Sequence, residues 1–215
     1  MSPDALETRL QQGLDALALH LDGAQRQQLL HYLELLWRWN RHFNLTAVRE
    51  REAMVARHLL DSLSLRPLLP PGAALDVGSG AGLPGIPLAI AAPERRFLLL
   101  DSNGKKTRFM FQATRELGLD NCEVARARVE SWNGAGPFDA VLSRAFASLA
   151  DMVDTCAHLL APQGVMLAMK GRPAEEELAA ARARAEIVSV TPLAVPGLEA
   201  ERCVVTLRPR STGPA

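Results

Sequence analysis

The sequence of 215 residues predicts an α/β protein with a mostly parallel sheet and helices on both of its faces, preceded by an N-terminal helical extension. Three observations lead to this fold class. From residue 73 onward, apolar segments of strand length alternate with helical segments, as in parallel sheets where each strand needs a crossover to reach the next. Before residue 70, the apolar residues follow helical spacing. A glycine-rich segment, residues 78–85, joins the first expected strand to a helix.

The first 70 residues are predicted to form a helical extension that packs on the core. Leucines at positions 6, 10, 14, 17 and 21 predict a helix over residues 4–21, which the following Asp22-Gly23 pair ends. A second helix is expected over residues 24–42 and a third over about 50–69, where Pro70-Pro71-Gly72 stops it.

Residues 71–210 are predicted to form the core of the fold, with a loose tail over residues 211–215. The expected strands are 73–77, 97–100, 122–125, 138–142, 165–169, 187–191 and 203–207. The expected helices between them are 105–117, 149–160 and 173–184. Because the link between the last two strands is short, one of them is expected to run antiparallel.

Composition excludes several classes of protein. Lysine plus arginine equals aspartate plus glutamate at 24 each, so no global field draws the chain onto nucleic acid, although a local patch can exist. Cys122, Cys156 and Cys203 are odd in number and far apart, which indicates a reducing compartment. Neither the cysteines nor the histidines have the spacing of metal ligands, so we expect no metal. Without a signal pattern or an apolar run near ~18 residues, we expect a cytoplasmic protein with no membrane contact.

The glycine-rich segment has two interpretations. Residues 80–85 match the G-x-G-x-x-G fingerprint of dinucleotide-binding folds, with Asp101 near the spacing of a ribose-binding acid. Alternatively, Gly78, Gly80 and Gly82 behind Asp76 match the first motif of S-adenosylmethionine methyltransferases, which share a Rossmann-like fold. Only the second interpretation, in which the motif starts at Gly78, puts the loop directly after the strand and Pro84 near the start of the helix.

The carboxylate of Asp76 also favours the second interpretation. At the end of the first strand it can accept from the cationic amino group of S-adenosylmethionine, whereas a pyrophosphate would be repelled. Asp101 can accept two hydrogen bonds from a ribose diol, and Val129 with Glu130 can offer a backbone N–H and a carboxylate to an adenine edge. A small NAD-binding oxidoreductase stays the alternative, although 215 residues show no separate substrate domain.

The end of the fourth strand, Ser143-Arg144, indicates which kind of nucleophile receives the methyl group. The aspartate or asparagine motif of amine methyltransferases is absent here, and no cysteine stands where a C5-pyrimidine methyltransferase needs a nucleophile. Arg144 offers hydrogen-bond donors but cannot act as a base. It therefore suits a nucleophile that needs no deprotonation, such as guanine N7. Lys170, at the end of the fifth strand, is a second candidate at the same edge.

Taken together, these motifs resemble those of the small-subunit ribosomal RNA methyltransferase G family, also called glucose-inhibited division protein B. The segments that carry the resemblance are 39–40, 43–46, 57–62, 76–87, 100–102, 129–130, 143–148 and 170–171. The resemblance covers about residues 25–207. It implies a Rossmann-like class I S-adenosylmethionine-dependent methyltransferase that methylates N7 of a guanine in the 530 loop of 16S ribosomal RNA. The cofactor would contact Gly78, Leu83, Asp101, Val129, Glu130 and Arg144.

RNA contact is expected from cations near the strand ends. We predict Lys105, Lys106, Arg128 and Lys170 as RNA-binding residues and His58 as a pocket residue from the helical extension. For His58 a satisfied, half-buried position is the simpler alternative. The expected partner is 16S ribosomal RNA or the small ribosomal subunit, and the chain is expected to be a monomer. An S-adenosylmethionine-binding module that docks on the ribosome without catalysis is a further alternative.

Overall fold

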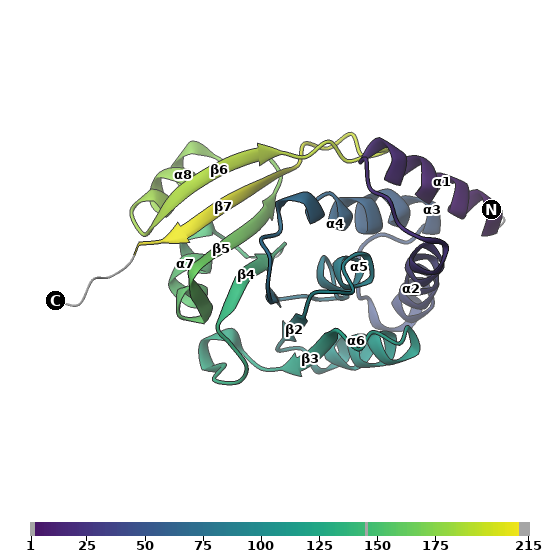
Figure 1. Cartoon of the computed structure of the whole chain (residues 1–215), viewed down its shortest axis with the longest axis horizontal. Helices are drawn as coiled ribbons and strands as arrows, with labels where there is room; N and C mark the ends of the chain where they lie inside the picture. The colour runs from purple at the N-terminus through teal and green to yellow at the C-terminus, as the bar shows by residue number, and fades with distance from the viewer. Residues whose placement is uncertain (1–2, 145, 211–215) are drawn as a thin grey trace.

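The computed structural model describes residues 3–144 and 146–210. Its described residues form one sheet of seven strands in the order β3-β2-β1-β4-β5-β7-β6 (Figure 1). The strands are β1 (Ala74–Val77), β2 (Phe97–Asp101), β3 (Cys122–Arg126), β4 (Phe138–Ser143), β5 (Leu160–Lys170), β6 (Ala185–Pro192) and β7 (Cys203–Pro209). The expected tail over residues 211–215 lies outside the described residues.

The sheet is parallel from β3 to β5, and β7 pairs antiparallel with both β5 and β6. The expectation of one antiparallel strand near the end of the chain is therefore confirmed. Strand order reverses at β1, whose neighbours are β2 and β4. In such sheets ligands bind beyond the carboxyl ends of the strands at this reversal. The start of β7 lies at that same edge, because β7 runs opposite to its parallel neighbours.

Two hydrophobic cores lie on opposite faces of the sheet, because successive strand residues point to opposite sides. Along β2, Phe97 and Leu99 enter one core, while Leu98 and Leu100 enter the other. The first core is covered by α1 (Pro3–Ala16), α2 (Gly23–Phe43), α5 (Gly85–Ala91) and α6 (Gly104–Glu116), and the second by α7 (Leu149–Cys156) and α8 (Glu175–Arg182). Figure 1 shows α7 and α8 away from α2, α5 and α6.

The first helix ends earlier than its leucine spacing predicts. It stops at Ala16, and Ala18 adopts a left-handed backbone with φ of 52°. Leu19 and Leu21 nevertheless lie in the first core. Burial of the leucines therefore continues through an irregular loop, so apolar spacing alone overestimates the helix. The second helix begins and ends within a residue of its prediction, with Asp22 as its N-cap.

The third helical segment is broken into short pieces. It consists of α3 (Arg51–Met54), a π-helical turn (Val55–Leu60), α4 (Asp61–Leu63) and a 3₁₀ turn (Arg66–Leu68), with Pro67 inside the last turn. A π-helical turn rotates the residues that follow it and often occurs at functional sites. Here it brings residues 57 and 61 to the carboxyl edge of the sheet, where Arg144 donates to the backbone oxygen of Arg57 and to the carboxylate of Asp61.

The helical extension packs on the core through polar contacts as well as leucines. The hydroxyl of Tyr32 donates to the backbone oxygen of Ala81 at 2.7 Å, so α2 contacts the glycine loop directly. Gln25 and Gln28 of α2 donate to the backbone oxygens of Ile90 and Leu117. The division at residue 70 into extension and core stays a prediction. Among the described residues, no helix is long and apolar enough to cross a membrane.

Candidate active site

The glycine loop after β1 is held by two buried carboxylates. Oδ2 of Asp76 accepts from the backbone N–H of Gly85 at 2.9 Å, which fixes the start of α5 to the end of β1. Oδ2 of Asp101 accepts from the N–H of Gly80 at 2.9 Å, and its Oδ1 accepts from Asn103 at 2.8 Å. Gly78, Gly80 and Gly82 all have positive φ, which favours glycine at each position. The loop is thus preorganised by its neighbours.

Asp76 is fully buried, and burial raises the pKa of its carboxyl from 3.8 to about 7. Hydrogen bonding from Gly85 opposes that rise. Its Oδ1 has no hydrogen-bond partner among the described residues. The direct contact with the amino group of a ligand stays a prediction, and what the structure adds is the role of Asp76 in holding the loop.

A cavity of about 220 Å³, the strand-end crevice, opens beyond the carboxyl ends of β1, β2 and β4. Of the residues predicted to bind the cofactor, four line it: Gly78, Asp101, Val129 and Glu130. Arg128 lines it too, together with Ser102, Ser143 and Phe146. Each carboxylate oxygen of Asp101 accepts one backbone hydrogen bond and has a second lone pair, so a ribose diol can still be accepted. Leu83 is buried and its backbone N–H donates to the oxygen of Ser79 at 2.9 Å, so its cofactor contact stays a prediction.

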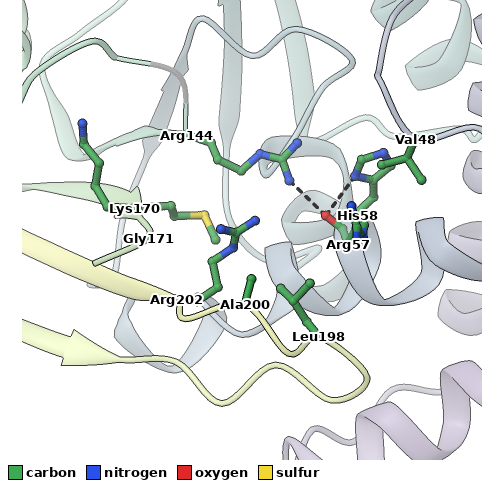
Figure 2. A pocket seen from close by; sticks show the side chains of 10 residues that line it. Val48, Arg57, His58, Arg144, Lys170, Gly171, Leu198, Ala200 and Arg202 are labelled. Atoms are coloured by element: carbon green, nitrogen blue, oxygen red, sulfur yellow. Dashed lines mark hydrogen bonds between the residues drawn. The ribbon is translucent and has the colours of Figure 1, made fainter. Parts of the chain in front are cut away.

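A second cavity of about 450 Å³ adjoins the end of β4 (Figure 2). We call it the arginine pocket. It is lined by Val48, Arg57, His58, Arg144, Met169, Lys170, Gly171, Leu198, Ala200 and Arg202. These residues come from the helical extension, the ends of β4 and β5, and the segment before β7. The lining contains no carboxylate. Ser143 and Arg144 are consecutive, so the end of β4 separates the arginine pocket from the strand-end crevice.

The guanidinium groups of Arg144 and Arg202 converge on one carboxylate. Nη1 of Arg144 donates to Oδ2 of Asp61 at 3.1 Å, and Nε of Arg202 donates to Oδ1 of Asp61 at 2.9 Å. Asp61 is fully buried behind the pocket wall. The same Nη1 of Arg144 donates to the backbone oxygen of Arg57 at 3.3 Å, one of the contacts drawn in Figure 2. Sequence reasoning placed Arg144 here but assigned no role to Asp61, Arg57 or Arg202.

His58 is buried beside the pocket and hydrogen-bonded at both ring nitrogens. Nδ1 lies 2.9 Å from the backbone oxygen of Arg57, and Nε2 lies 2.9 Å from Oγ1 of Thr46. A carbonyl oxygen can only accept, so we assign the ring proton to Nδ1 and the acceptor role to Nε2. Burial, and then the charge of Arg144, lower the pKa of His58 from 6.5 to about 4. The ring is therefore neutral near pH 7, and an RNA contact by His58, still a prediction, would not be ionic.

Lys170 points away from the two arginines. Figure 2 shows its side chain extending to the opposite side of the pocket from Arg202. Its Nζ lies 2.8 Å from Oε1 of Glu177 and donates to the backbone oxygen of Phe146 at 3.2 Å. Glu177 also accepts from the N–H of Leu149 at the start of α7. Lys170 thus braces the segment after β4, and its predicted catalytic and RNA-binding roles stay untested.

The remaining predicted RNA-binding cations lie near the strand-end crevice. Lys105 and Lys106 lie in the first turn of α6, whose N-cap is Asn103, and the Nζ of Lys106 lies 3.9 Å from Oδ2 of Asp101. Lys105 and Arg128 are exposed. By contrast, Arg182 and Arg184 form surface ion pairs with Glu175 and Asp154. Among the described residues, no group of histidine, cysteine and acidic side chains could hold a metal ion.

Solved structures with a similar fold include methyltransferases. One is a TehB-like S-adenosylmethionine-dependent methyltransferase from Corynebacterium glutamicum, 15% identical with a TM-score of 0.55, covering 84% of this chain and 98% of the other. Another is the N-methyltransferase NodS from Bradyrhizobium japonicum, 19% identical with a TM-score of 0.51, covering 70% and 92%. At these identities the likeness establishes the fold, a class I S-adenosylmethionine-dependent methyltransferase architecture.

Sequence relatives are far closer. The family model described as rRNA small subunit methyltransferase G matches residues 25–205. The ribosomal RNA small subunit methyltransferase G of Nitrosococcus oceani is 52% identical over 207 residues, covering 96% of this chain and 97% of the relative. The protein of the same name from Pseudomonas aeruginosa is 50% identical over 200 residues, covering 93% and 94%. The chain belongs to the rRNA small subunit methyltransferase G family.

Proposed function

We propose that the chain transfers a methyl group from S-adenosylmethionine to N7 of a guanine in the 530 loop of 16S ribosomal RNA. Family membership supports methyl transfer to small-subunit ribosomal RNA. The observation that carries the choice of atom is the arginine pocket. It adjoins the strand-end crevice and offers hydrogen-bond donors with no free base.

The strand-end crevice fits S-adenosylmethionine. Asp101 has lone pairs for a ribose diol, and Val129 and Glu130 line the same crevice. Among the described residues, the buried Oδ1 of Asp76 has no hydrogen-bond partner. When bound, the cofactor supplies an activated methyl group on its sulfonium. The chain's own contribution is to hold the target atom in line with that methyl group, which lowers the barrier through orientation.

The pocket favours a nucleophile that carries no proton. His58 has both ring nitrogens in hydrogen bonds, Lys170 is paired with Glu177, and arginine cannot act as a base. Amino or hydroxyl nucleophiles would need a proton acceptor in the pocket. Guanine N7 already presents a lone pair in the plane of the base, and arginine donors directed at O6 orient the ring without blocking N7. The non-catalytic ribosome-docking module has no observation in its favour.

Transfer of labelled methyl from S-adenosylmethionine to small-subunit RNA tests this proposal. We expect incorporation with the wild-type chain into ribosomal RNA, retained label after removal of protein, and no incorporation into transfer RNA. The matched control is Arg184→Ala, which removes an exposed arginine paired with Asp154 and should leave the rate unchanged. Absence of label from ribosomal RNA, from both naked RNA and intact subunits, would contradict the proposal.

A further inference from the structure

Asp61 is the buried charge around which the arginine pocket is assembled. It is the first residue of α4, and its backbone N–H donates to Ala56 and His58 across the π-helical turn. Its side chain is fully buried, and each of its two oxygens accepts from a different arginine. A carboxylate without solvent contact is stable only when paired and hydrogen-bonded, so both arginines are tied to this position.

The two arginines arrive from distant parts of the chain. Arg144 follows β4, whereas Arg202 precedes β7 and lies 141 residues from Asp61 in sequence. Two guanidinium groups placed side by side repel each other unless a negative charge lies between them. Asp61 supplies that charge from the helical extension. One carboxylate therefore joins three separate segments at the wall of one pocket.

The pairing leaves donors of both arginines available. The bonds to Asp61 and Arg57 use Nη1 of Arg144 and Nε of Arg202. Among the described residues, no hydrogen bond from another nitrogen of either guanidinium is recorded, and their side chains are 26% and 30% exposed. Figure 2 shows both guanidinium groups directed toward the middle of the pocket. Guanidinium groups held in this way are suited to phosphate and to acceptor atoms of a base.

We propose that Asp61 is a positioning residue for the RNA substrate: it fixes Arg144 and Arg202 so that their remaining N–H donors face the nucleotide that enters the arginine pocket. Asp61 itself does not line the pocket and acts through the two arginines. This inference rests on the proposed function. The two side-chain oxygens of Asp61 accept from the arginines, and the hydroxyl of Ser64 donates to the backbone oxygen of Asp61. None of these contacts reaches the glycine loop, so the effect of Asp61 is expected in the arginine pocket and not in the strand-end crevice.

The first test compares Asp61→Asn with the wild-type chain in methyl transfer to small-subunit RNA. Asparagine keeps the size of the side chain but loses its charge and half of its acceptor capacity. We expect kcat/KM for RNA to fall roughly 10- to 100-fold, the effect of displacing a positioned group by about 1 Å. The Kd for S-adenosylmethionine, measured by calorimetry, should stay within about twofold of wild type. Asp139→Asn is the matched control, because it makes the same change at a carboxylate that accepts from the backbone N–H of Ala73, at the opposite end of β4.

The second test separates positioning from a merely structural role. RNA affinity, read by fluorescence anisotropy of a labelled RNA hairpin, is measured for Asp61→Asn alone and in an Arg144→Ala, Arg202→Ala background. If Asp61 acts through the arginines, the substitution weakens binding in the wild-type background and has no further effect once both are gone. An undiminished effect in that background would overturn the proposal.

Three further outcomes are distinguishable. An active wild-type chain with an Asp61→Asn variant of equal kcat/KM would overturn the role of Asp61 and leave the proposed function intact. A wild-type chain that transfers no methyl to RNA would overturn both. Loss of cofactor affinity in Asp61→Asn equal to its loss of kcat/KM would also overturn the proposal, because the defect would then lie in the crevice.

Discussion

The strand-end crevice and the arginine pocket meet at the end of β4, yet they are built by different means. The crevice is formed by a glycine loop whose backbone N–H groups are held by Asp76 and Asp101, close to their own strands. The arginine pocket is built around two long cationic side chains, Arg144 and Arg202, which come from distant segments and are joined at the carboxylate of Asp61 in a third segment. The first site depends on local backbone geometry, and the second depends on tertiary ion pairs. Substitutions should therefore affect cofactor affinity and RNA transfer separately.

The largest difference between the effect on methyl transfer to RNA and the effect on cofactor affinity is expected for Arg144→Ala. We expect kcat for methyl transfer to RNA to fall roughly 10²- to 10³-fold, the usual effect of removing one positioned donor. The Kd for S-adenosylmethionine should change far less, because the Arg144 side chain contacts Asp61 and Arg57 rather than the crevice. Calorimetry and single-turnover transfer on the same preparation measure both. A variant that loses cofactor affinity as strongly as turnover would place Arg144 functionally in the crevice.

The pH dependence of the free energy of unfolding tests whether His58 is buried as a neutral ring beside the arginine pocket. Its pKa is about 4 in the folded chain against 6.5 unfolded, so below pH 6.5 the unfolded chain binds a proton that the folded chain does not. The stabilising contribution is thus fully present above pH 6.5 and is lost as the pH falls through 4. From the shift, the loss amounts to roughly 3 kcal/mol.

Urea denaturation at pH 7, 5.5 and 4.5 measures this effect as a difference between the wild-type chain and His58→Gln. We expect the wild-type chain to lose more free energy of unfolding than the variant as the pH falls. Parallel pH profiles for the two chains would show that His58 is accessible to protons in the folded state.

In the strand-end crevice, Asp101→Asn should weaken binding of the cofactor. The variant loses the charge that accepts from Gly80 and that would accept from a ribose. Because a hydrogen bond to a charged group contributes about 1.5–3 kcal/mol, we expect the Kd for S-adenosylmethionine to rise about 10- to 100-fold. At saturating cofactor, the KM for RNA should stay near its wild-type value. Asp120→Asn, at an exposed carboxylate before β3, is the matched control.

The smallest effect is expected where the helical extension contacts the glycine loop. Tyr32→Phe removes the hydrogen bond to the oxygen of Ala81 and leaves that buried carbonyl without its donor. We expect a loss of about 1 kcal/mol in the free energy of unfolding and a few-fold weaker cofactor affinity. Gln28→Ala, which removes a bond from the same helix to Leu117, should affect stability without affecting cofactor affinity. Equal cofactor effects in both variants would contradict a specific link from Tyr32 to the loop.

The same contrast explains what the sequence could predict. The strands and the glycine loop follow from local patterns, since buried apolar runs are bounded by glycine, proline and acidic residues. Asp101 and Arg144 could be placed because each directly follows or ends a strand whose carboxyl end meets the site. These inferences need only short stretches of chain and one rule of sheet topology.

The arginine pocket could not be predicted in the same way. Asp61 and Arg202 come together through the π-helical turn, which has no local signature, and through the antiparallel course of β7. The short link before the last strand was the one available signal, because an antiparallel last strand begins at the carboxyl edge of the sheet. Likewise, the pairing of Lys170 with Glu177 depends on tertiary packing, so the side-chain type of Lys170 alone suggested a more exposed role.

The most direct test of the proposed function is to map the modified base. Small-subunit ribosomal RNA from a strain lacking the enzyme is incubated with the wild-type chain and S-adenosylmethionine, then treated with borohydride and aniline, which cleave at N7-methylguanine. The account predicts a new cleavage at one guanine of the 530 loop, absent without cofactor and strongly reduced with Arg144→Ala. Labelled methyl found in the RNA without any borohydride-dependent cleavage would contradict transfer to guanine N7.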